Sequence, residues 1–187
     1  MRKLTVFNQV SLDGYFTDAH GDMSWAHRSD PEWDAFTQSN ATGGGTLLFG
    51  RITYEQMASF WPTPQAKKMM PVVADAMNKL PKVVFSRTLN EAAWANTALV
   101  KTDLLEAVRG LKRTAGADLV IMGSGTIVSQ LAQAGLVDVF QVVLNPIVLG
   151  QGRTMFEGVD HRLSLKLTDT RRFTNGNVVL SYEPAYG

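Results

Sequence analysis

The chain has 187 residues, 45% of them hydrophobic, and a formal net charge of +1. These values predict one compact domain over residues 1–187, with no bulk electrostatic attraction to nucleic acids or acidic membranes. Because the sequence contains no cysteine, disulfides, thiolate metal sites and a cysteine nucleophile are excluded.

The first segment, Lys3–Val10, has alternating apolar residues and many β-formers, which predicts a strand. Basic residues precede it, but no small-residue cleavage site follows, so a signal peptide is not predicted. No window approaches the roughly 20 consecutive apolar residues that a membrane span needs. We therefore expect a cytoplasmic protein.

A helix is predicted to begin after Asp30, because this residue is a favoured N-cap and Pro31 suits the first helical turn. Trp33 and Phe36 lie three residues apart and give this helix one aromatic face. The Gly43–Gly45 run is expected to end it.

Strands and helices then alternate along the middle of the chain. Strands are predicted for TLLFG (46–50), KVVFS (82–86), TALV (97–100) and the fully apolar run in DLVIM (118–122). Helices are predicted for ITYEQMASFW (52–61), QAKKMMPVVADAMNKL (65–80, with a proline interruption), TDLLEAVRGLKRTAG (102–116) and TIVSQLAQAG (126–135). Asp103 and Glu106 have the spacing of a capping box at the start of the third of these helices.

The C-terminal part predicts a strand in VDVFQVVLNPIVLG (137–150) and then a hairpin of LKLTDTRRF (165–173) and VVLSYEP (178–184). Asn175-Gly176 is a strong signal for a two-residue turn between the hairpin strands. The whole order indicates an α/β fold with three layers: a mostly parallel central sheet, helices on both faces and a C-terminal antiparallel hairpin.

The segment MGSGT joins a predicted strand to a predicted helix at the sheet edge where α/β proteins bind ligands. Gly123 and Gly125 would let a phosphate approach the helix N–H groups, and Ser124 and Thr126 could add donors. The alternative is that the glycines only permit a tight turn. The full dinucleotide fingerprint is missing, because Val128 stands where a glycine is required.

Two further strand ends carry residues that could bind phosphate. They are FGRITYE, with Gly50, Arg51 and Thr53, and FSRTL, with Ser86, Arg87 and Thr88. Taken alone, Arg51 could be a solvated salt-bridge partner and Arg87 an ordinary loop cation. Three such ends in one small sheet favour a shared phosphate site.

LLFGRITYEQM, VVFSRTL and DLVIMGSGTIVSQLAQAGLVDVF, together with SLDGYF and NPIVLGQGRTMF, resemble the dihydrofolate reductase-like superfamily. The resemblance spans nearly the whole chain in the right order. It is greatest to stand-alone relatives of the C-terminal reductase domain of bifunctional riboflavin biosynthesis deaminase/reductase proteins. Relatives of this branch often pair through sheet edges, which implies a homodimer.

The resemblance also implies an NADPH site. Arg51 would meet the adenosine 2′-phosphate, with the loop at Arg87 on its other side, and the glycine turn would lie under the pyrophosphate. Leu12 and Gly14 would border the nicotinamide. The complete implied set is Leu12, Gly14, Gly50, Arg51, Thr53, Ser86, Arg87, Thr88, Gly123, Ser124, Gly125 and Thr126.

We expect a reductase that transfers hydride from NADPH to a small polar heterocyclic or carbonyl/imine substrate. Asp13 and Glu32 are the candidate catalytic acids, and an ordered water is the alternative proton source. Asp13 could equally belong to a turn with Gly14, and Glu32 could serve only the helix dipole. Tyr15 stands where riboflavin enzymes commonly have a basic residue, which argues against a phosphoribosyl substrate.

The three histidines have no ligand spacing, so no metal site is expected. A different functional class stays open: a nucleotide-binding sensor or scaffold without catalytic turnover.

Overall fold

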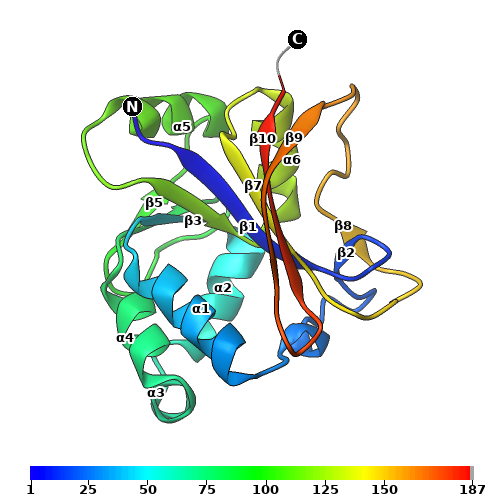
Figure 1. Cartoon of the computed structure of the whole chain (residues 1–187). Coiled ribbons are helices and arrows are strands. Elements are labelled where there is room, and N and C mark those ends of the chain that lie inside the picture. Colours follow the sequence, from blue (N-terminus) through cyan, green and yellow to red (C-terminus); the bar gives the residue numbers. More distant parts are fainter. Residues whose placement is uncertain (186–187) are drawn as a thin grey trace.

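The computed structural model describes residues 1–185 and contains an eight-stranded sheet in the order β5-β4-β3-β6-β1-β7-β10-β9 (Figure 1). The strands from β5 to β7 in this order are parallel to one another, whereas β10 is antiparallel to β7 and β9 is antiparallel to β10. Their bounds are β1 Leu4–Val10, β3 Thr46–Gly50, β4 Lys82–Phe85, β5 Thr97–Val100, β6 Leu119–Met122, β7 Val139–Leu144, β9 Leu165–Arg172 and β10 Val178–Pro184. The predicted mostly parallel sheet with a C-terminal hairpin is confirmed.

Helices cover both faces of the sheet, as predicted (Figure 1). They are α1 Pro31–Thr42, α2 Arg51–Phe60, α3 Pro64–Met69, α4 Pro71–Lys79, α5 Leu104–Arg113 and α6 Gly125–Gln133. Side chains of α5 and α6 share one apolar core cluster, and α1, α2 and α4 pack on the opposite face in two others. The interruption predicted within residues 65–80 is real, because Pro71 begins a new helix there.

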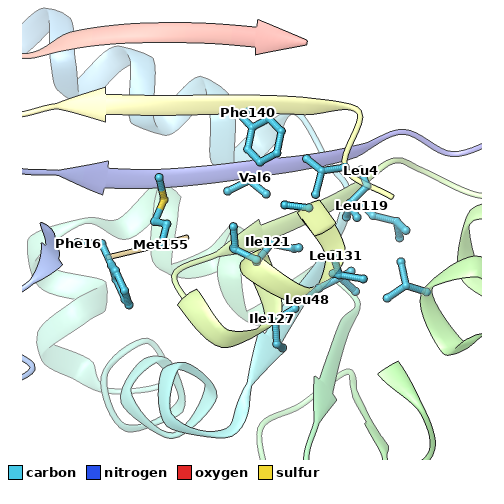
Figure 2. Packing of buried hydrophobic residues seen from close by; sticks show 14 of the residues in the cluster. Leu4, Val6, Phe16, Leu48, Leu119, Ile121, Ile127, Leu131, Phe140 and Met155 are labelled. Carbon is cyan, nitrogen blue, oxygen red and sulfur yellow. The ribbon is translucent and has the colours of Figure 1, made fainter. Parts of the chain in front are cut away.

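Strand β1 shows how alternation creates the two faces. Leu4, Val6 and Val10 belong to the cluster under α5 and α6, while Phe7 packs near Trp33 on the other side. Figure 2 shows this core, with Leu4 near the start of β1. Strand β1 therefore lies between α5 and α6 on one face of the sheet and α1 on the other.

Both predicted helix caps form. The Asp30 carboxylate accepts from the backbone N–H groups of Glu32 (2.9 Å) and Trp33 (3.0 Å) at the start of α1. Asp103 accepts from Glu106 N at 3.0 Å, but the Glu106 carboxylate pairs with an arginine one turn later. The predicted capping box is therefore only half formed.

The structure differs from the sequence predictions in its short elements. A two-stranded sheet of β2 (Tyr15–Thr17) and β8 (Arg153–Thr154) was not predicted, since such short strands show no alternation. A 3-10 helix, η1, spans Ser24–Ala26.

The loop of the C-terminal hairpin also differs from the prediction. Gly176, with φ +91, closes a three-residue loop by donating its backbone N–H to Phe173 O. The predicted two-residue turn is wrong, and the left-handed glycine completes the longer loop.

Candidate functional site

A cavity of about 580 Å³ opens at the carboxyl ends of β4, β3, β6 and β1. It collects most of the predicted cofactor residues from three separate strand ends. Those that line it are Gly50, Arg51, Thr53, Ser86, Arg87, Gly123, Ser124, Gly125 and Thr126. The parallel sheet brings them together, because parallel strands end at a common edge.

Hydrogen bonds join the first turns of α2 and α6 at this edge. Ser124 N donates to Thr53 Oγ1 (3.1 Å), and Gly50 N donates to Ser124 Oγ (2.9 Å). Gly123 adopts φ +67, and a Cβ there would lie 2.9 Å from Thr53 Cγ2. The glycine therefore provides both the left-handed backbone and the close approach of the two helices.

Asn8 fixes the other side of the glycine turn and was not predicted as a site residue. It is buried in β1, where its Oδ1 accepts from Gly123 N at 2.5 Å. Its Nδ2 donates to the sulfur of Met155 at 2.9 Å. A signal was available in the sequence: Asn8 occupies an inward position between Val6 and Val10, where an apolar residue is expected.

The two predicted phosphate-binding arginines, Arg51 and Arg87, differ in whether their side chains already have a charged partner. Arg51 forms an ion pair with Glu55 one helical turn away (3.0 Å), and both side chains are about half exposed. Arg87 has no hydrogen-bond or ion-pair partner among residues 1–185. Thr88 does not line the cavity but an adjoining surface depression of about 660 Å³, which it shares with Arg51 and Glu55.

The loop carrying Leu12, Asp13 and Gly14 does not line the cavity. The Asp13 carboxylate instead accepts from the backbone N–H groups of Leu149 (3.1 Å) and Gly150 (2.7 Å). The Ser11 hydroxyl, followed by these N–H groups, holds the pKa of Asp13 below its usual range. Its observed role is to tie two loops together.

Glu32 also lies outside the cavity. Its carboxylate pairs with Arg171 on β9 at 3.0 Å, and that guanidinium lies over the rings of Phe36 and Phe173. The first turn of α1 therefore faces the C-terminal hairpin and not the cavity edge. Neither of the two candidate acids is brought to the residues that line the cavity.

The cavity is also lined by residues that were not predicted as site residues. Aromatic and thioether side chains prevail here, with a few polar groups from β1 and the β2–β8 sheet. They are Phe7, Gln9, Phe16, Thr17, Met23, Met57, Met122 and Arg153. The sequence showed no signal for the convergence of these positions, because they come from separate loops and strands and from helix α2.

Within residues 1–185, no group of three or more His, Cys, Asp or Glu side chains could hold a metal ion. No helix in this part of the chain combines the length and apolar character needed to cross a membrane.

The family model of the RibD C-terminal domain matches residues 2–179. The chain belongs to this family. The match confirms the resemblance to stand-alone relatives of the riboflavin-type reductase domain.

The protein YyaP of Bacillus subtilis (strain 168) is 30% identical over 182 residues, covering 97% of this chain and 94% of YyaP. The crystal structure of a putative riboflavin biosynthesis protein from Shewanella sp. PV-4 superposes with a TM-score of 0.75 at 23% identity, with both chains fully covered. Dihydrofolate reductase from Enterococcus faecalis, complexed with NADP(H) and RAB-propyl, has a TM-score of 0.63 at 15% identity, covering 97% of this chain and 96% of that one. These two structures confirm the dihydrofolate reductase-like fold.

Proposed function

We propose that the protein is an NADPH-dependent reductase acting on a small polar heterocyclic or carbonyl/imine substrate in the cytoplasm. The observation that carries the proposal is the convergence of three strand ends on one cavity at the hydrogen-bonded first turns of α2 and α6. Membership of the RibD C-terminal domain family supports the same reading.

The lining of the cavity fits a dinucleotide phosphate. At the start of α6 the intrahelical bonds begin with Ile127 and Val128, so the N–H groups of Gly125 and Thr126 precede them. Such groups, with the hydroxyls of Ser124 and Thr126, form an anion-binding surface for the pyrophosphate. In bound NADPH the nicotinamide supplies the hydride, and the protein orients it and excludes water.

The adenosine 2′-phosphate would pair with Arg87, whose guanidinium has no hydrogen-bond or ion-pair partner within residues 1–185. It would also pair with Arg51, whose guanidinium would then be shared between Glu55 and the phosphate. An unphosphorylated ribose would leave both cations without this partner. The expected cofactor preference is therefore for NADPH over NADH.

Arg51→Ala and Arg87→Ala test the assignment by fluorescence titration with each cofactor. Each variant should lose about tenfold or more in NADPH affinity and stay within about twofold for NADH. The control is Arg113→Gln, which removes a charge from the exposed end of α5. Equal losses for NADPH and NADH would remove the 2′-phosphate assignment.

The source of the proton is proposed to be water. Among residues 1–185, the one carboxylate that lines the cavity belongs to Asp103, and it accepts from Glu106 N at the start of α5. No other Asp or Glu side chain of the described residues lines the cavity. Solvent therefore remains the nearest proton source for the reduced substrate.

The same lack of an acid favours a second candidate, a sensor or scaffold that binds NADPH without turnover. Cofactor titration beside NADPH-oxidation assays with pyrimidine, pterin and quinone panels separates the two. Tight binding without oxidation of NADPH by any panel member would favour the second candidate.

We also propose a homodimer formed through the β9 edge of the sheet. All eight residues of β9 are exposed, including Leu165 and Leu167. An uncovered strand edge of this kind is a ready partner for a second strand. Light scattering should give a dimer mass that Leu167→Lys reduces to that of a monomer; a monomeric unaltered chain would refute the proposal.

A further inference from the structure

We propose that Asn8 is a positioning residue for the pyrophosphate of the cofactor. Its side-chain amide holds the glycine turn in the conformation that presents the N–H groups of Gly125 and Thr126 to the cavity. The inference rests on the cofactor assignment proposed above and adds to it a residue from β1. Asn8 is 3% exposed and lines the cavity.

Strand β1 carries Asn8 past the end of β6. It pairs with β6 as far as Phe7, which lies opposite Met122, and continues to Val10 paired with β7 alone. Asn8 is the first residue of that extension, and Gly123 is the first residue after β6. The two residues therefore lie side by side where the sheet meets the cavity.

The amide of Asn8 matches Gly123 through both its oxygen and its nitrogen. Oδ1 accepts from Gly123 N at 2.5 Å, and Nδ2 donates to Gly123 O at 3.4 Å and to the sulfur of Met155 at 2.9 Å. The orientation of the amide is set by these partners, because Gly123 N can only donate and Gly123 O can only accept. An apolar side chain at this position would make none of the three contacts.

The turn depends on such contacts because two consecutive residues are left-handed. Gly123 has φ +67, and Ser124 has φ 59 and ψ 58. A residue with a Cβ rarely adopts this conformation, and it persists only where the surrounding structure fixes it. Here Asn8 binds Gly123 N, and Thr53 Oγ1 binds Ser124 N at 3.1 Å. The turn is thus held from β1 on one side and from α2 on the other.

These two anchors decide which N–H groups of the turn remain for a ligand. Those of Gly123 and Ser124 are bound by the side chains of Asn8 and Thr53. The next two, of Gly125 and Thr126, have no hydrogen-bond partner among residues 1–185. A pyrophosphate at the start of α6 depends on the direction of this second pair. Loss of the Asn8 anchor would let the turn rotate and would direct these N–H groups away from the cavity.

Three probes, titrated calorimetrically, separate this role from the others. NADPH and NADH both carry the pyrophosphate, whereas adenosine 2′-monophosphate carries the 2′-phosphate without it. Asn8→Leu is close in size and removes both amide groups. It should weaken NADPH and NADH equally, each by about fivefold or more, and keep the affinity for adenosine 2′-monophosphate within about twofold. A general loosening of the fold would weaken all three.

Arg87→Ala should give a different pattern, because it acts on the 2′-phosphate. It should weaken NADPH and adenosine 2′-monophosphate and keep NADH. Met155→Leu is the matched control for Asn8, since it removes the contact of Nδ2 with the sulfur and leaves the bond to Gly123 N. It should keep all three affinities within about twofold.

Thr53→Val tests the same turn from its other anchor and decides the matter if Asn8→Leu does not fold. It removes the acceptor of Ser124 N and should repeat the pattern expected for Asn8→Leu. A folded Asn8→Leu variant with unchanged affinity for NADPH and NADH, or with an equal loss for adenosine 2′-monophosphate, would overturn the proposal. If Asn8→Leu does not fold, either of these results in Thr53→Val would overturn it.

The pattern across variants also separates this inference from the function on which it rests. If Arg87→Ala weakens NADPH more than NADH but Asn8→Leu changes neither, the cofactor assignment stands and the role of Asn8 is refuted. If the unaltered protein binds neither NADPH nor NADH, both are refuted.

Discussion

Replacing Gly123 with alanine tests whether contact with α2 sets the glycine turn. Gly123 has φ +67, a conformation that costs a residue with a Cβ about 1–2 kcal/mol. The new Cβ would lie 2.9 Å from Thr53 Cγ2 and 3.1 Å from Thr53 Oγ1, and overpacking of this kind costs about 1–3 kcal/mol. We expect the free energy of unfolding to fall by about 2–5 kcal/mol in total.

Gly14→Ala is the matched control, because Gly14 has φ +87 but no heavy atom within 4 Å of its Cβ position. It should lose only the conformational part, about 1–2 kcal/mol. Urea unfolding at a common m-value measures both losses from the shift in midpoint.

A third variant isolates the contact. Thr53→Ser removes Cγ2 and keeps Oγ1, which accepts from Ser124 N. Combined with Gly123→Ala, it should recover about 1 kcal/mol or more of the loss. The reasoning is refuted if Gly123→Ala costs no more than Gly14→Ala, or if the double variant recovers nothing.

Two further variants probe charged groups. Glu55→Gln frees Arg51 from its ion pair and should raise NADPH affinity up to about fivefold, with NADH unchanged in parallel titrations; an equal gain for NADH would contradict the role of Arg51. Lys82 is 1% exposed, its Nζ donates to the carbonyls of Met77 and Leu80, and burial lowers its pKa from 10.5 to about 8. Between pH 8 and 10.5 the unfolded chain therefore binds more protons at Lys82 than the folded chain, so the free energy of unfolding should rise with pH. Lys82→Met should lack that rise in urea unfolding at pH 7, 9 and 10; an identical slope in both proteins would refute it.

Much of the fold could be predicted because its signals are local. Asp30 caps α1 through the N–H groups two and three residues ahead, and Pro71 starts α4 at its own position. The alternation of Leu4, Val6 and Val10 assigns one face of β1 to the core. Each of these signals depends on dihedral preferences or side-chain direction within a few residues.

Only those residues of the candidate site that are assigned to the cofactor could be predicted from the sequence. Gly50, Arg87 and Gly123 each lie at or just after the end of a strand, and parallel strands end at one edge of the sheet whatever the loops do. The roles of Asp13 and Glu32 depended on distant partners. Asp13 binds a loop 137 residues away, and Glu32 pairs with a strand 139 residues away.

The sequence by itself determined the longer helices and strands, the mostly parallel character of the sheet and the glycine turn, since backbone preferences and apolar periodicity act along the chain. The tertiary structure alone decided that Asn8 holds Gly123, that β8 pairs with β2, and that Arg153 reaches the cavity. These contacts join residues more than a hundred positions apart. Their energy comes from packing and hydrogen bonds that exist only once the core has brought the segments together.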